Sequence, residues 1–161
     1  LCGGAMAAAA AYSHQAPKSL AIDIGARLRS GDTLVALHEY PFQLQLYSRS
    51  PSPIWVVDDW LDPQIPLRDN WRKELYDAAH FDPVQGQQVL LSDRLLRERL
   101  CEAPAGARYW IWGGADDATR KPLLANRQPV LSEGRSRVWL IEAGDGLMRQ
   151  ACGETPIAGL Q

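Results

Sequence analysis

Apolar residues in this sequence follow two patterns that alternate along the chain. Short, nearly continuous apolar runs occur at residues 33–37, 54–57, 89–91 and 109–112. Runs of this length, rich in Val, Ile, Leu and Trp, predict strands that are covered on both faces, as in a parallel sheet. The segments between the runs carry apolar residues at helical spacing, with polar residues on the other face.

Three of these intervening segments predict helices. The first covers residues 17–29, where Leu20, Ile24 and Leu28 recur every fourth residue. The second covers residues 68–80, and its polar face, which includes Arg72, is expected to meet solvent. The third follows Ser92, a favourable helix-capping residue, and extends to about residue 101. Residues 40–47 are compatible with a short helix or a strand, and residues 116–125 predict a weak helix.

The alternation of strands and helices predicts an α/β domain with a mostly parallel sheet and right-handed crossovers. Flanking helices would complete a three-layer, Rossmann-like arrangement. Near the C-terminus, two apolar segments around Gly134–Ser136 predict an antiparallel hairpin. We expect the domain to cover residues 17–143, and residues 144–161 to form an irregular tail. Residues 1–16 would be a flexible N-terminal segment or a cloning remnant, and because the chain starts with Leu1 we expect a fragment of a longer protein.

Composition narrows the function classes. The chain has 161 residues, of which 46% are hydrophobic and 22% charged, as expected for one folded domain. Its net charge of −2 argues against a nucleic-acid partner. No glycine-rich phosphate loop, dinucleotide fingerprint or serine nucleophile elbow is present, so we expect no cofactor and assign no catalytic residue.

The cysteines leave two interpretations open. Cys2, Cys101 and Cys152 form no metal-binding spacing, and the three histidines form none either, so no metal site is predicted. Cys101 and Cys152 could form a disulfide in an oxidising compartment. Alternatively, Cys101 is a buried free thiol on an apolar helix face.

Polar and aromatic side chains follow the first two predicted strands. Ligands of open parallel sheets bind at the carboxyl ends of the strands, so these residues form the candidate ligand site. Because successive side chains point to opposite faces, one of the two adjacent aspartates should bond the local backbone and the other should stay available. The simpler alternative is that they cap loops and cover the sheet edge. The candidates are His38, Glu39, Tyr40, Asp58, Asp59 and Trp60.

The order of these motifs resembles that of a known family. The segments are Gly-Asp-Thr-Leu-Val-Ala-Leu-His-Glu-Tyr at 31–40 and Ile-Trp-Val-Val-Asp-Asp at 54–59, with Leu46 and Tyr47 between them. Over roughly residues 17–142 the chain resembles the soluble C-terminal domain of bacterial integral-membrane glycosyltransferases related to aminoarabinose transferase of lipid A and to protein O-mannosyltransferases. The stretch from Asp58 to Arg72 has no counterpart to which a role can be assigned.

The resemblance implies a parent with many membrane helices and a polyprenyl-phosphate-linked sugar donor. The catalytic carboxylates of such enzymes lie in the membrane part, so this domain would not catalyse transfer alone. It would lie on the periplasmic face of the inner membrane, contact the membrane-embedded part of the same chain, and shape the site for the lipid-linked sugar donor or the glycan acceptor. The alternatives are a stand-alone ligand- or protein-binding α/β module and a small independent α/β enzyme.

Overall fold

The fold is organised around one six-stranded sheet. The computed structural model describes residues 17–153. The sheet order is β3-β2-β1-β4-β6-β5, in which β3, β2, β1 and β4 are parallel and β6 is antiparallel to both of its neighbours, β4 and β5. This confirms the predicted α/β class, the mostly parallel sheet and the antiparallel hairpin. The strands are β1 (Thr33–Leu37), β2 (Trp55–Val57), β3 (Leu90–Leu91), β4 (Arg108–Gly114), β5 (Leu131–Glu133) and β6 (Ser136–Glu142).

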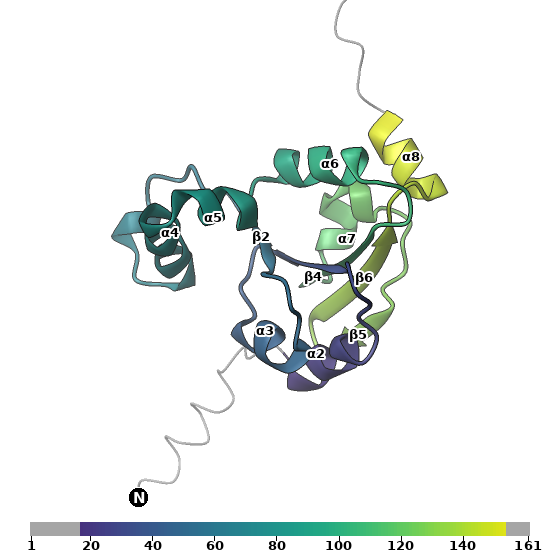
Figure 1. Cartoon of the computed structure of the whole chain (residues 1–161), viewed down its shortest axis with the longest axis horizontal. Helices are drawn as coiled ribbons and strands as arrows, with labels where there is room; N and C mark the ends of the chain where they lie inside the picture. Colours follow the sequence, from purple (N-terminus) through teal and green to yellow (C-terminus); the bar gives the residue numbers. More distant parts are fainter. Residues whose placement is uncertain (1–16, 154–161) are drawn as a thin grey trace, which may run out of the picture.

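Helices cover the sheet on both faces (Figure 1). One face carries α2 (Lys18–Gly25) and α3 (Phe42–Ser48). The opposite face carries α6 (Asp93–Glu102), α7 (Asp117–Arg120), the 3-10 turn η2 (Pro122–Leu124) and α8 (Gly146–Gly153). The remaining elements lie beyond the β3 edge: the 3-10 turn η1 (Ile65–Leu67), α4 (Trp71–Phe81) and α5 (Pro83–Val89).

The continuous apolar runs are explained by two cores, one on each face of the sheet. In β1, Leu34 and Ala36 pack toward α2 and α3, whereas Val35 and Leu37 pack toward α6 and η2. Trp112 of β4 joins the first core and is 1% exposed. A strand buried on both faces has no solvent-facing positions, which is why the sequence shows no alternation there.

Residues 83–89 form α5, although the sequence predicted no helix there and placed the start of the third strand at residue 89. The Asp82 side chain accepts a hydrogen bond from the Gln85 backbone N–H at 3.1 Å and begins the helix, with Pro83 in its first turn. Gly86 allows α5 to cross α4 closely, since a Cβ there would lie 2.6 Å from the Cβ of Ala79. Gly86, which weakens the helical pattern, is therefore the residue that this crossing requires.

The predicted irregular tail was wrong for residues 146–153, which form α8. Asp145 begins this helix by accepting a hydrogen bond from the Met148 N–H at 2.7 Å, and Met148 is buried. A helix of eight residues with one fully buried side chain leaves only a weak periodic pattern. The predictions for residues 1–16 and 154–161 lie outside the described residues.

A disulfide between Cys101 and Cys152 joins α6 to α8, with the two Cα atoms 5.7 Å apart. Cys101 is exposed, so the alternative of a buried free thiol was wrong. Arg97 adds a second link between the same helices, because its Nη2 donates to the Ala151 carbonyl at 2.7 Å. Here "the stapled face" means α6, η2 and α8 with the core beneath them.

Candidate functional site

The carboxyl ends of β1 and β2 lie side by side, as the predicted parallel pairing requires. Leu37 is in register with Val57, and the His38 N–H donates to the Val57 carbonyl at 2.8 Å. His38 has a φ of 55°, in the left-handed region that non-glycine residues rarely occupy. The sheet therefore holds His38 in a left-handed conformation, next to Asp58, the residue that follows β2.

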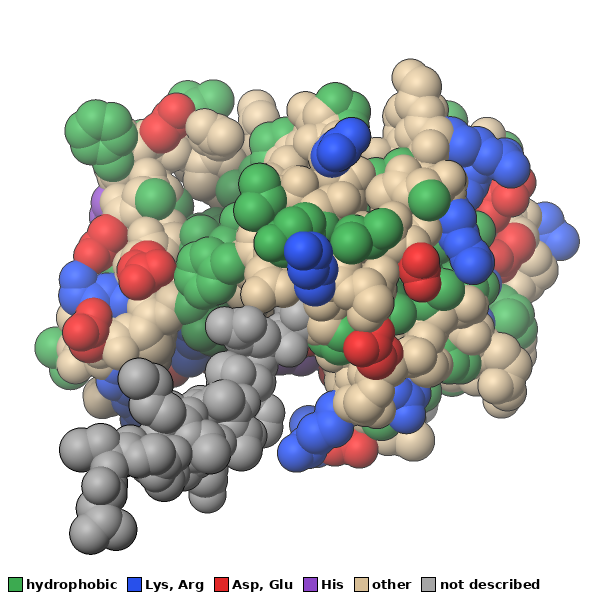
Figure 2. Space-filling model, turned by 90° about the horizontal axis from the view of Figure 1, so that it is seen from below, with side chains coloured by type: hydrophobic (Ala, Val, Ile, Leu, Met, Phe, Trp, Pro, Cys, Tyr) green, Lys and Arg blue, Asp and Glu red, His purple; other side chains and the backbone are tan. Residues whose placement is uncertain are grey.

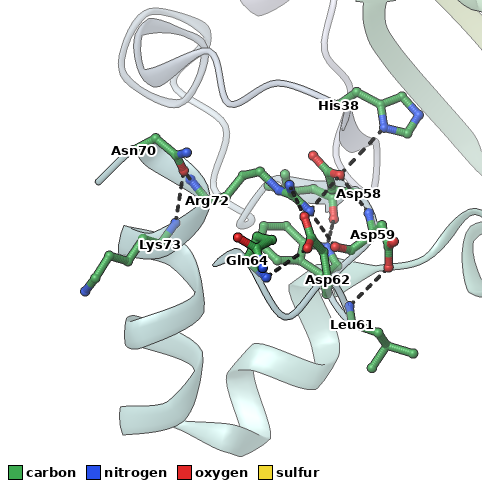
Figure 3. Close-up of polar contacts among 11 residues, drawn as sticks. His38, Asp58, Asp59, Leu61, Asp62, Gln64, Asn70, Arg72 and Lys73 are labelled. Carbon is green, nitrogen blue, oxygen red and sulfur yellow. Dashed lines mark hydrogen bonds and ion pairs between the residues drawn. The ribbon is translucent and has the colours of Figure 1, made fainter. Parts of the chain in front are cut away.

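His38 and Asp58 meet at this edge (Figure 3). His38 Nδ1 lies 4.0 Å from Asp58 Oδ1, which is an ion-pair distance and too long for a direct hydrogen bond. The Asp58 side chain is only 13% exposed, whereas that of His38 is 41% exposed. The edge therefore presents an accessible imidazole over a largely covered carboxylate.

Arg72 is the residue that organises this edge, although the sequence predicted it to face solvent. Its guanidinium lies 3.4 Å from Asp58 and 3.0 Å from Asp62, and also donates to the Asp59 carbonyl at 2.5 Å (Figure 3). Asn70 caps α4 by accepting from the Arg72 N–H at 3.0 Å. The cap places Arg72 in the first turn, where its side chain reaches back to the loop after β2. We call His38, Asp58, Asp62 and Arg72 the strand-end cluster.

Within this cluster the pKa of His38 is raised and the pKa of Asp58 is lowered. The interaction with Asp58 raises the pKa of His38 above 6.5, and it outweighs partial burial and the charge of Lys121, which act in the opposite direction. Burial alone would raise the pKa of Asp58, but the interactions with His38, the Asp59 N–H and Arg72 together lower it below 3.8. At neutral pH Asp58 is therefore ionised, and His38 is protonated to a larger extent than a free histidine.

The other predicted site residues lie around this edge and do not converge on one point. Glu39 turns away and accepts from Trp112 Nε1 at 2.6 Å. Burial is the main cause of its raised pKa, and the charge of Asp117 adds to it. Tyr40 packs its ring edge-on against Phe42, with the ring centroids 4.8 Å apart.

Both members of the acidic pair accept hydrogen bonds from nearby backbone N–H groups, which differs from the expectation that one of them would stay available. Asp59 is exposed and accepts from the Leu61 N–H at 3.2 Å, so it is the local loop cap. Asp58 accepts from the Asp59 N–H at 2.7 Å and also faces His38 and Arg72. Trp60 donates from Nε1 to the Val56 carbonyl at 3.2 Å. A ligand role for these six residues stays a prediction.

A groove of about 410 Å³ lies between the sheet edge and the helices α4 and α5. Tyr40, Gln45 and Ile54 line its body side, and Leu75, Asp82 and Gln85 line the other. Figure 2, which views the molecule from below, shows hydrophobic side chains both on the helices α4 and α5 and on the body of the domain. We call residues 61–89 the α4–α5 lobe.

The α4–α5 lobe carries apolar side chains that nothing in the described chain covers. Leu61 and Phe81 are each 93% exposed, Leu67 is 73% exposed and Val84 is 71% exposed. No residue of α4 is fully buried. Because exposed apolar surface can mark a contact with another molecule, these side chains make the lobe a candidate contact surface.

Comparison with known proteins identifies a similar fold within a larger enzyme. No family model matches the chain, and no curated protein matches it in sequence. The crystal structure of ArnT from Cupriavidus metallidurans bound to undecaprenyl phosphate matches with a TM-score of 0.53 over 76% of this chain, at 14% identity. The apo structure of the same protein matches with a TM-score of 0.52.

The match confirms the predicted resemblance at the level of the fold. The matched region is 19% of the ArnT chain, so this protein corresponds to about a fifth of that enzyme. Among residues 17–153, no helix is long and apolar enough to cross a membrane, and no group of three or more His, Cys, Asp or Glu residues is placed to hold a metal ion. The disulfide is consistent with a location outside the cytoplasm.

Proposed function

We propose that this chain is an extracytoplasmic accessory domain of a membrane glycosyltransferase that uses a polyprenyl-phosphate-linked sugar. The observation that carries the proposal is the fold match to a fifth of ArnT, a protein crystallised with undecaprenyl phosphate. The disulfide between Cys101 and Cys152 supports a periplasmic location, because such bonds persist in oxidising compartments. The domain shapes the donor or acceptor site and does not catalyse transfer by itself.

In this proposal the α4–α5 lobe contacts the membrane-embedded part of the same parent chain. The uncovered side chains of Leu67, Phe81 and Val84 supply the apolar surface for that contact. The strand-end cluster fixes the first turn of α4 through Arg72, so it sets the orientation of the lobe relative to the sheet. The cluster then affects transfer by positioning this contact surface.

The proposal is tested in the full-length parent encoded by the same gene. Phe81→Ser combined with Val84→Ser should lower transfer from the lipid-linked sugar by about tenfold or more, because loss of buried apolar contacts at an interface core costs at least ~1.4 kcal/mol. Arg120→Gln in α7 is the control outside the lobe, since Arg120 is 72% exposed. Equal melting temperatures of the corresponding 161-residue chains show that the variants remain folded.

Two results contradict the proposal. One is a gene whose product has no membrane-spanning segments, which favours the stand-alone binding module. The other is robust transfer by the purified 161-residue chain from polyprenyl-phosphate sugar to an acceptor, which favours the independent enzyme. Wild-type transfer by the doubly substituted parent overturns the assignment of the lobe as the contact surface.

A further inference from the structure

A second cavity, of about 280 Å³, lies beneath the stapled face. Its walls are leucine and isoleucine side chains from four elements: β1, β4, α6 and η2. Ala151 of α8 closes one side. The apolar wall residues are Leu37, Leu96, Ile111, Leu123 and Leu124.

The position of this cavity in the sheet is one that binds ligands in other open α/β folds. The chain runs from β1 to β2 to β3 in one direction, and then returns to place β4 on the other side of β1. The strand order therefore reverses between β1 and β4, and ligands of such sheets bind at the carboxyl ends of the strands at that reversal. Leu37 is the last residue of β1, so the cavity reaches this end of the sheet.

The rim of the cavity is charged and has more cations than anions. Arg94, Arg97 and Lys121 line it together with Asp93. Arg97 is held in place by its bond to the Ala151 carbonyl, which uses only one of its nitrogens. Lys121 is 16% exposed and lies 2.5 Å from Asp93, whereas Arg94 is highly exposed and pairs with Glu98. Arg97 and Lys121 are therefore the two anchored cations at the mouth.

We propose that this cavity binds a lipid phosphate by the end of its apolar chain, with the phosphate held by Lys121 and Arg97. A sugar or peptide would leave polar groups unpaired against the leucine walls, which is costly. A phosphomonoester carries up to two negative charges and suits two adjacent cations, and an arginine can bind it with two parallel hydrogen bonds. The small volume admits one chain and excludes a double-chain phospholipid.

The disulfide contributes directly to this cavity. Cys152 follows Ala151, and its bond to Cys101 holds α8 against α6, whose residues form the opposite wall. Reduction frees α8 and opens one side of the cavity. The lipid-phosphate site therefore requires the oxidised protein. Only the choice of an isoprenoid probe rests on the proposed function.

Binding is measured by calorimetry on the 161-residue chain with geranyl phosphate, kept below its micelle concentration. Geraniol tests the contribution of the isoprenoid chain alone, and inorganic phosphate tests that of the head group alone. Decanoate tests a carboxylate in place of the phosphate. Geranyl phosphate should bind at least about tenfold more tightly than each of these, the effect of one charge-assisted contact. Methyl NMR shifts at Leu37, Leu123 and Leu124 place the ligand in the cavity.

Two variants test the phosphate-binding rim and the apolar cavity separately. Lys121→Gln should weaken geranyl phosphate about tenfold and leave geraniol unchanged, whereas Ala151→Leu should weaken both by filling the cavity. Arg120→Gln is the matched control, because Arg120 is adjacent to Lys121 and 72% exposed. Reduction with dithiothreitol should weaken binding of geranyl phosphate in the wild type.

Three outcomes overturn the inference: no binding of geranyl phosphate, equal binding of geraniol, or equal binding of decanoate. Binding that Ala151→Leu leaves unchanged also overturns it, because the ligand is then elsewhere. Transfer by the full-length parent is assayed separately. If the 161-residue chain does not bind geranyl phosphate but the full-length parent still transfers sugar, this site is refuted and the proposed function is not.

Discussion

The stapled face covers one face of the sheet and the α4–α5 lobe lies beyond the β3 edge, and the two regions are built in opposite ways. On the stapled face, Leu96, Leu100 and Met148 are each at most 3% exposed, and a disulfide fixes the helices to each other. In the lobe, α4 has no fully buried residue and Phe81 is 93% exposed. The difference indicates a division of roles, in which the stapled face stabilises the domain and the lobe is left uncovered for a contact.

The largest effect should come from removing the disulfide. Replacing Cys101 and Cys152 together by Ser should lower the free energy of unfolding by about 4 kcal/mol, the loop-entropy estimate for a separation of 51 residues. Denaturant unfolding of the oxidised wild type and the variant measures this. Hydrogen exchange in the lobe should change little, and a loss of protection that begins in α4 would contradict the division of roles.

A core substitution on the stapled face should cost nearly as much. Leu100→Ala removes a side chain that is 1% exposed and should cost about 2–5 kcal/mol. Phe81→Ala in the lobe is the comparison and should change stability by less than about 0.5 kcal/mol, since it removes an exposed group. If both substitutions destabilise the chain equally, Phe81 packs in the folded domain and the comparison fails.

Removal of Arg72 should lower the free energy of unfolding by an intermediate amount, and its effect should extend into the α4–α5 lobe. Arg72→Met leaves the largely covered Asp58 carboxylate without its cation, at a cost of about 1–3 kcal/mol, and should increase hydrogen exchange in the first turn of α4. Lys73→Met is the control, because Lys73 pairs with Asp77 on the outer surface of the same helix. An equal loss of stability in the two variants would contradict the role of Arg72 as the anchor of the lobe.

The smallest effect concerns pH. Because the pKa of His38 is raised in the folded state, its interaction stabilises the fold below pH 6.5 and is lost as pH rises through the folded pKa. The pKa of Asp58 is lowered, so its contribution is present above pH 3.8 and is lost as pH falls through its folded pKa. The pair therefore contributes most between these two values.

Titration of the His38 ring by NMR checks this directly. The midpoint should lie above 6.5 in the wild type and should fall in Asp58→Asn, which removes the carboxylate charge. An unchanged His38 midpoint in Asp58→Asn would show that the two side chains do not interact in solution.

Part of this picture could be predicted from the sequence because it depends on local pattern. The continuous apolar runs predicted the parallel strands, and parallel pairing then placed His38 beside Asp58. The partner of Glu39 could not be predicted, since Trp112 is far away in sequence and its position depends on β4 lying next to β1. Arg72 was missed because α4 begins at Trp71 and not at residue 68, so Arg72 lies in the first turn, where its side chain reaches the loop after β2.

The most direct test of the contact surface uses photo-crosslinking in the full-length parent. A benzophenone amino acid replaces Phe81 in the lobe in one protein and Arg94 on the stapled face in another, both highly exposed positions. The proposal predicts that position 81 crosslinks to the membrane-embedded part of the same chain and that position 94 does not. Crosslinking from position 94 alone, or no protein crosslink from position 81, would contradict it.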